Sequence, residues 1–188
     1  MSGAVALAKR SAIGCPGPTF AARIMKVLVL RFSSIGDIIL TSPVLRCLKR
    51  QVTGSEVHFL TKDQFRPLVE NSPYVDRVHG IHGTDREILS GLRKERFDLV
   101  VDLHHNLRTW RVKRSLGVPA KSFPKLNIEK WVLVNFKKDL LPKVHIVDRY
   151  LETVAHLGVK NDGQGLDLFI PPEKEVGPEA LPGPFRHG

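Results

Sequence analysis

The amino-acid sequence predicts an α/β domain in which a parallel sheet is covered by helices on both faces. Short runs rich in β-branched and other apolar residues alternate with longer stretches in which apolar residues recur three and four positions apart. The chain has 188 residues, of which 42% are hydrophobic and 26% charged, and this is the size and composition of one ordinary globular domain. We therefore expect a single core built around a single sheet.

The predicted elements follow one another in the order that parallel pairing requires, since each crossover between parallel strands contains a helix. The expected strands are residues 26–31, 56–61, 75–81, 98–103 and 121–124. The expected helices are residues 37–50, 63–70, 85–95, 106–116 and 145–157, the last ending at Gly158. Asp63, Asp85 and Asn106 stand at helix starts, where their side chains can accept hydrogen bonds from backbone N–H groups.

The two ends of the chain differ from its centre. Residues 1–24 contain three basic residues, no acidic residue and no apolar stretch long enough for a secretory signal. They are interpreted as a disordered tail, or as the result of a start codon assigned upstream of Met25. Residues 173–188 are rich in proline and predict a linker or a ragged end. The domain is therefore expected at residues 25–172.

Composition excludes several classes of protein. No apolar run approaches the roughly 20 residues that span a bilayer. With only two cysteines, Cys15 and Cys47, neither a disulfide framework nor a zinc cluster is expected, and a cytoplasmic location fits. The net charge is +10, and residues 93–149 carry +8 of it. This excess predicts an anionic partner such as a phosphorylated lipid, an acidic sugar, a membrane surface or nucleic acid, and a solvated lysine-rich surface is the alternative.

The first candidate site is the segment SSIGD, residues 33–37, which follows the first predicted strand. In open parallel sheets, ligands bind at the C-terminal ends of the strands. The segment lacks the glycines of a dinucleotide fingerprint and the lysine of a P-loop, which argues against an oxidoreductase or a nucleoside triphosphatase. Ser33 and Ser34 are candidate hydrogen-bond donors, and Gly36 predicts a tight turn open to a ligand. Asp37 is either a helix cap or a carboxylate aimed into a crevice.

The second candidate site is the segment DLHHNLRTWRVKR, residues 102–114, after the fourth predicted strand. Its polar side chains should lie along the same edge of the sheet as Asp37; they are Asp102, His104, His105, Asn106 and Arg108. On a helix, Arg108, Arg111 and Arg114 are successive neighbours, and their guanidinium groups suit carboxylate or phosphate. The adjacent histidines would point to opposite faces of a strand, and no third ligand has suitable spacing, so no metal site is expected.

Three segments, in this order, closely resemble the N-terminal half of the family 9 glycosyltransferases, the ADP-heptose:lipopolysaccharide heptosyltransferases. They are MKVLVLRFSSIGDIILTSPVLRCLKRQ (25–51), FDLVVDLHHNLRT (97–109) and HIVDRYLETVAHLGV (145–159). The resemblance extends from Met25 to about Pro172. It implies a Rossmann-like domain that forms the N-terminal half of a GT-B fold. It further implies an inverting transfer of heptose or a related sugar from an ADP-sugar to the lipopolysaccharide inner core, without a metal or other cofactor.

The resemblance also implies roles for individual residues. Asp37 matches the expected general base. Arg108 and the HxVDRY segment, with His145, Asp148, Arg149 and Tyr150, would lie toward the acceptor or support it. Together with the two candidate segments, this implies an acceptor-binding set of Ser33, Ser34, Gly36, Asp102, His104, Asn106, Arg108, Arg111, His145 and Arg149.

The implied partners are a Kdo-bearing lipid A or inner-core oligosaccharide and the inner membrane, which the protein would contact peripherally. The donor-binding domain is expected to be absent, so the chain by itself is expected to be inactive and to lack the ADP-sugar site. The alternative is a free-standing binding module for an anionic partner such as nucleic acid. That alternative is weaker, because the sequence has no recognised nucleic-acid motif and few aromatic residues among its basic ones.

Overall fold

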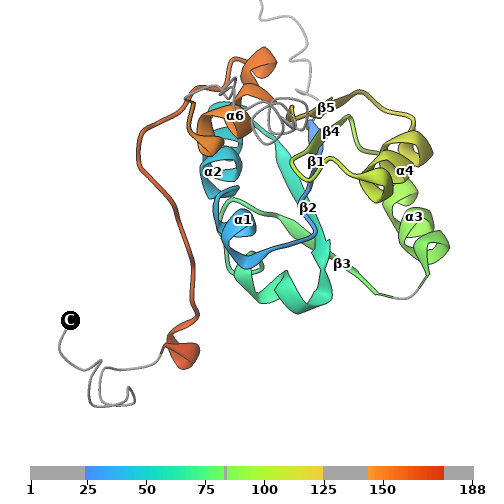
Figure 1. Cartoon of the computed structure of the whole chain (residues 1–188), viewed down its shortest axis with the longest axis horizontal. Helices are drawn as coiled ribbons and strands as arrows, with labels where there is room; N and C mark the ends of the chain where they lie inside the picture. The colour runs from blue at the N-terminus through green and yellow to red at the C-terminus, as the bar shows by residue number, and fades with distance from the viewer. Residues whose placement is uncertain (1–23, 83, 125–143, 176–188) are drawn as a thin grey trace, which may run out of the picture.

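The protein has a five-stranded parallel sheet in the strand order β3-β2-β1-β4-β5 (Figure 1). The structure is a computed structural model that describes residues 24–82, 84–124 and 144–175. The strands are β1 (Lys26–Leu30), β2 (Glu56–Lys62), β3 (Arg77–Ile81), β4 (Leu99–Asp102) and β5 (Ala120–Ser122). Every pair of neighbouring strands is parallel, so the predicted sheet is confirmed.

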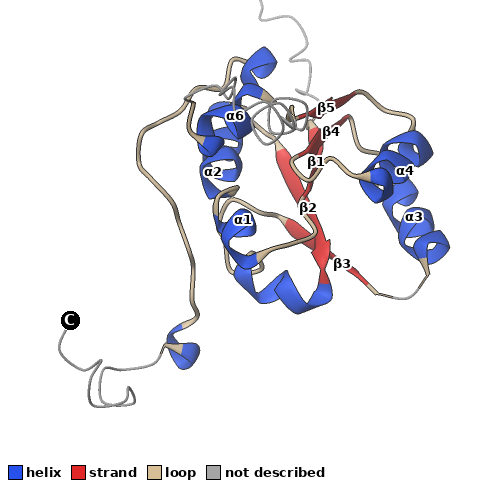
Figure 2. Ribbon diagram, viewed as in Figure 1, coloured by secondary structure: helices blue, strands red, loops and turns tan. Residues whose placement is uncertain are grey.

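Helices cover both faces of the sheet, as Figure 2 shows. One face carries α1 (Ile35–Ile39), α2 (Ser42–Gln51) and α6 (Ile146–Glu152), and the other carries α3 (Asp85–Lys94) and α4 (Leu107–Leu116). The central strand is buried on both sides. Val27 and Val29 pack into the core beneath α2 and α6, whereas Leu28 and Leu30 pack into the core beneath α3 and α4. A continuous apolar run is typical of such a strand, because alternate side chains enter different cores.

The predicted helix at residues 37–50 is wrong in extent, because it is two helices. The first, α1, begins at Ile35, with Ser34 as its N-cap residue. The second, α2, begins at Ser42 and has Pro43 in its first turn. Proline lacks the N–H that would continue the hydrogen-bond ladder, and its ring clashes with the preceding turn. The break between the two helices follows from this residue.

Two other predicted helices also differ from the structure. Residues 63–70 form a 3-10 helix, η1 (Asp63–Leu68), which contains Pro67. Residues 145–157 divide into α6 and a short 3-10 helix, η2 (Ala155–Leu157). The predicted end at Gly158 is confirmed, because this glycine has φ of +81°, a conformation that L side chains rarely adopt.

The predicted boundaries of the strands are confirmed only in part. The third strand begins at Arg77 and the fifth covers Ala120–Ser122, both shifted from the expected ranges. A 3-10 helix, η3 (Pro172–Lys174), occupies the start of the expected linker. Residues 1–23 and 176–188, which hold most of the expected tail and linker, lie outside the described residues. In the described part of the chain, no helix has the length and apolar content needed to cross a bilayer.

The topology places the two candidate segments at one point of the sheet. From β1 the chain proceeds outward through β2 and β3, and it then returns to form β4 on the other side of β1. The loops after β1 and β4 therefore run in opposite directions, and in open parallel sheets ligands usually bind at such a point, at the C-terminal ends of the strands. Leu30 and Asp102 are partners in the register, so the two loops start side by side.

Candidate functional site

Asp37 lies in the first turn of α1 and forms a reciprocal cap with Ser34. Its Oδ2 accepts hydrogen bonds from the backbone N–H of Ser34 at 3.3 Å and from the Ser34 hydroxyl at 3.1 Å. The same oxygen forms an ion pair with the Arg31 guanidinium at 2.5 Å, and the Asp37 side chain is 39% exposed. The interpretation of Asp37 as part of a helix cap is therefore confirmed, while its carboxylate still reaches solvent.

The environment of Asp37 favours the ionised carboxylate. Partial burial acts to raise the pKa of Asp37, but the hydrogen bond from the Ser34 backbone and the interaction with Arg31 outweigh it, so the pKa lies below its ordinary value. At neutral pH the carboxylate is charged, as a proton acceptor must be.

Arg31 connects three separate segments at this site, and the sequence analysis did not single it out. Its side chain is 9% exposed and donates to the carbonyl oxygens of Ser33, at 2.8 Å, and Leu103. It also donates to the Tyr150 hydroxyl at 3.0 Å and pairs with Asp37. Arg31 thus joins the loop after β1, the loop after β4 and helix α6. The sequence does contain a signal for this role. Arg31 directly follows a buried strand, and a charged side chain in such a position needs partners.

Asp102 supports the second loop and does not face a ligand. The residue is fully buried at the end of β4. Its Oδ1 accepts the backbone N–H groups of His104 at 3.1 Å and His105 at 2.7 Å, and its Oδ2 pairs with Lys113 at 2.7 Å. The expectation that Asp102 binds the acceptor directly is wrong, because its oxygens are occupied by the loop and by α4.

Asp102→Asn tests this supporting role. The amide retains an acceptor oxygen but loses the charge that faces Lys113 and strengthens the two backbone hydrogen bonds. We expect a loss of about 1.5 to 3 kcal/mol in the free energy of unfolding, the range for hydrogen bonds to a charged group. Urea unfolding measures it, and exposed Asp148→Asn is the control. A loss no larger than that of the control would contradict the role.

The other residues of the second loop form its turn and begin α4. Asn106 is the N-cap of α4 and accepts the Thr109 N–H at 2.9 Å. His105 has φ of +52°, and its Nδ1 lies 3.0 Å from the carbonyl oxygen of Phe123. The His104 ring lies 5.0 Å from the Phe32 ring. Asn106 therefore caps α4, and the His104 ring packs against Phe32.

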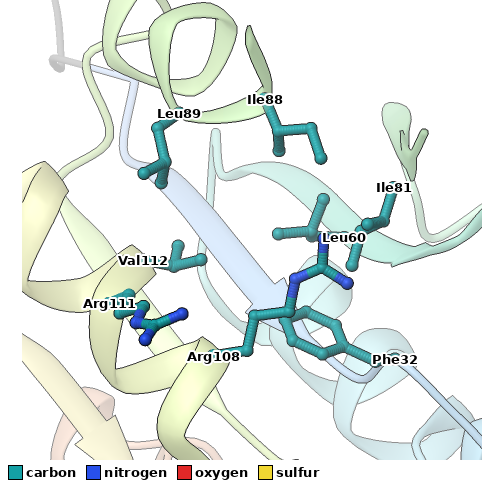
Figure 3. A pocket seen from close by; sticks show the side chains of 8 residues that line it. All are labelled: Phe32, Leu60, Ile81, Ile88, Leu89, Arg108, Arg111 and Val112. Atoms are coloured by element: carbon teal, nitrogen blue, oxygen red, sulfur yellow. The ribbon is translucent and has the colours of Figure 1, made fainter. Parts of the chain in front are cut away.

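Arg108 and Arg111 stand at an apolar pocket between the sheet and helices α3 and α4 (Figure 3). The apolar residues that line it are Phe32, Leu60, Ile81, Ile88, Leu89 and Val112. The guanidinium carbon of Arg108 lies 6.0 Å from the centre of the Phe32 ring. Arg108 also borders a second pocket with Lys62 and His82. Arg108 and Arg111, which the sequence predicted to be binding residues, thus lie at one pocket together with Phe32.

The remaining predicted residues are distributed around the site. His145 is the N-cap of α6, where its Nδ1 accepts the Val147 N–H at 3.3 Å, and it lines a separate pocket with Pro43. Arg149 donates to the carbonyl oxygen of Pro124, and its guanidinium lies over the Phe123 ring.

Gly36 is helical, so the tight turn expected there is wrong. A Cβ atom added at Gly36 would meet no atom within 4 Å, which leaves the backbone open to a ligand.

Comparisons with known proteins identify similar sequences and folds. No family model matches the chain. The lipopolysaccharide heptosyltransferase 1 of Campylobacter coli is 27% identical over 118 residues, which are 60% of this chain and 34% of that protein. The solved glycosyltransferase family 9 protein from Veillonella parvula aligns with a TM-score of 0.60 and 21% identity, covering 79% of this chain and 46% of that one. The Escherichia coli heptosyltransferase WaaC, solved with ADP, aligns with a TM-score of 0.59 and 20% identity, covering 76% and 50%.

These matches agree with the three sequence segments that resemble the same enzymes. The chain spans about a third of the curated relative and about half of each solved structure. Its five-stranded parallel sheet corresponds to one half of a GT-B heptosyltransferase. The chain therefore resembles the heptosyltransferases of glycosyltransferase family 9, in sequence over about a third of the curated relative and in fold over about half of the solved structures.

Proposed function

We propose that this chain is the acceptor-binding half of an inverting glycosyltransferase that transfers heptose or a related sugar from an ADP-sugar to the lipopolysaccharide inner core. The observation that carries the proposal is the ionised, partly exposed Asp37 carboxylate at the point where the strand order reverses. The segment that bears Asp37 also bears Phe32, against which Arg108 lies. In this proposal Asp37 is the proton acceptor, and the basic side chains beside Phe32 bind the acceptor substrate.

Asp37 has the chemistry that an inverting transfer needs. A sugar hydroxyl is a poor nucleophile, and it attacks more readily when a carboxylate accepts its proton while the new glycosidic bond forms. In that step the acceptor oxygen bonds to the anomeric carbon, the bond to ADP breaks on the opposite face, and the proton moves to Asp37. The bonds from Ser34 and Arg31 hold the carboxylate in place before the acceptor arrives.

The basic side chains around Arg108 suit an acidic acceptor. Arg108, Arg111, Lys62 and His82 line two adjoining pockets, and guanidinium groups bind carboxylate and phosphate with paired hydrogen bonds. A Kdo-bearing lipid A or inner-core oligosaccharide carries such groups and would be met at the membrane surface. The Escherichia coli relative was also solved with ADP-2-deoxy-2-fluoro heptose. In our proposal the ADP-sugar is held by the other half of the enzyme, and this chain is inactive alone.

Arg108→Ala tests the acceptor site. Loss of one charge-assisted contact, worth about 1.5 to 3 kcal/mol, should weaken the binding of a Kdo-containing acceptor by roughly 10- to 100-fold. The variant should also bind with a weaker dependence on salt, because one screened ionic contact is gone. Titration calorimetry at low and moderate salt measures both effects.

Lys94→Ala is the matched control, since it removes one exposed positive charge from the last turn of α3, whereas Arg108 lies in the first turn of α4. This variant should retain the affinity of the unmodified chain. Unchanged affinity of Arg108→Ala at low salt would show that Arg108 is only a solvated surface charge, and the acceptor site would then lie elsewhere.

A further inference from the structure

A second group of polar side chains lies beneath α3, toward the N-terminal ends of the strands. His58 on β2 is fully buried, His79 on β3 is partly buried, and Glu95 directly follows α3. Nδ1 of His58 and Nε2 of His79 are 2.9 Å apart, and one ligand atom from each of the three residues lies within 4.8 Å of the others. We propose that His58, His79 and Glu95 bind a divalent transition-metal ion such as Zn²⁺. This site is separate from the sugar-transfer site and does not depend on the proposed function.

The register of the sheet explains why these residues meet. His58 is paired with Arg77, so His79 lies two residues farther along β3 on the same face. His58 is also paired with Leu28, whose side chain enters the core under α3 and α4. Glu95 reaches this face because α3 ends above it. Three segments separated in the chain thus contribute two imidazoles and one carboxylate.

Glu56 provides the supporting contact that metal-binding histidines usually have. Its Oε1 lies 2.7 Å from Nε2 of His58. Lys26 lies 3.2 Å from the same oxygen, so this contact suits a carboxylate that accepts a hydrogen bond from Nε2 of His58. Nε2 of His58 therefore carries the proton, and the lone pair of Nδ1 faces His79. A carboxylate that fixes the tautomer of a ligand histidine in this way is a recurrent feature of zinc sites.

His79 is placed to act as a second ligand, because it is only partly buried and its Nε2 lies beside Nδ1 of His58. His79 also lines an open pocket with Gly80, His82 and Gly91. Water can enter there and supply a fourth ligand. Two histidines, one carboxylate and one water form a common tetrahedral zinc set.

Two basic residues compete for the carboxylate of Glu95. Lys26 lies 3.3 Å from Oε2, and Arg77 donates to Oε1. Both side chains are exposed enough to turn toward solvent, with 28% and 58% of their surface accessible. The two histidine nitrogens would need to separate by only about 0.4 Å, since zinc–nitrogen bonds of 2.0–2.1 Å in a tetrahedron place them about 3.3 Å apart. Metal binding would also replace the hydrogen bond between the two rings, turn both nitrogens toward the ion and bring in the Glu95 oxygen, which lies within 4.8 Å of them.

Optical titration with Co²⁺ tests the site directly. The chain, without a histidine tag, is treated with a chelator, dialysed and titrated with CoCl₂. We expect the visible absorption bands of tetrahedral Co²⁺ at one ion per chain, and loss of these bands when ZnCl₂ is added. His79→Ala and Glu95→Gln should each weaken Co²⁺ binding at least 10-fold, whereas His82→Ala, which removes an exposed histidine at the same pocket, should not.

A second measurement guards against a variant that fails to fold. Zn²⁺ should raise the Tm of the unmodified chain and of His82→Ala in proportion to the logarithm of its concentration, because it binds only the folded state. Circular dichroism confirms that His79→Ala is folded before its affinity is compared. The proposal is overturned if the unmodified chain gives no tetrahedral bands at millimolar Co²⁺. It is equally overturned if folded His79→Ala binds as tightly as the unmodified chain.

Discussion

Replacing Asp37 with asparagine is expected to lower sugar transfer by about 100-fold or more while the domain remains folded. Asparagine has nearly the same size and can still accept the Ser34 N–H, but it no longer pairs with the nearly buried Arg31, so the expected loss of stability is about 1.5 to 3 kcal/mol. It cannot accept the proton of the attacking hydroxyl. Because the chain spans about half of its solved relatives, the measurement is ADP release by this chain joined to the donor-binding half of a family 9 enzyme.

Ser34→Ala is the matched control, because it removes the hydroxyl bonded to Asp37 but leaves the carboxylate. Because Ser34 helps to hold this carboxylate in place, turnover should fall, but by much less than in Asp37→Asn. The pKa of Asp37 is held below its ordinary value, so activity should be present at neutral pH and be lost as the pH falls through that lowered pKa. In Ser34→Ala the pKa should rise, and the acid limb of the pH profile should move to higher pH. If folded Asp37→Asn has near-normal turnover, Asp37 is not the general base and serves only in the reciprocal cap with Ser34.

Replacing Arg46 with methionine is expected to cost about 3 to 5 kcal/mol in the free energy of unfolding, the range for breaking a buried ion pair from one side. Arg46 lies on α2, and its side chain is 1% exposed. It contacts Asp162 through two hydrogen bonds of 2.7 and 2.6 Å, as well as Asp167 and the carbonyl oxygen of Gly165. Methionine fills much of the volume but removes the buried charge that faces both Asp162 and Asp167. Urea unfolding measures the loss.

Arg50→Ala is the control for this network. Arg50 lies one turn farther along α2, is 50% exposed and stands 3.9 Å from Asp162. An exposed pair of this kind contributes about 0 to 1 kcal/mol. If Arg46→Met costs no more than Arg50→Ala, the buried network does not stabilise the domain.

The Arg46 network should also make stability depend on pH. The hydrogen bonds from Arg46 hold the pKa of Asp162 well below its usual range in the folded chain. The contribution of this carboxylate is therefore fully present above the ordinary aspartate pKa and is lost as the pH falls through the lowered, folded-state pKa. Arg46→Met should unfold with a weaker dependence on pH in this acidic range.

Local sequence patterns predicted the elements of the fold and the approximate position of the site. The apolar run before Arg31 indicated a buried strand, and Asn106 indicated the start of a helix. Both elements could be predicted because each signal lies in residues that are adjacent in the chain. Placing Asp37 and Arg108 at one edge also followed from sequence, since parallel strands align their C-terminal ends. The fold class and the edge of the sheet shared by the two segments were thus predictable from the sequence, whereas the strand order β3-β2-β1-β4-β5 came from the structure.

The role of each polar side chain at that edge depends on contacts between segments that are distant in the chain. Asp102 was expected in the binding site, yet the loop and Lys113 enclose its carboxylate. Arg31 was overlooked because its partners Leu103 and Tyr150 are 72 and 119 residues away, and no local periodicity encodes such contacts. The pair His58 and His79 depends likewise on the register between β2 and β3. The partners of a side chain depend on the positions of backbone segments that are distant in the sequence, and the packing of the whole core sets those positions.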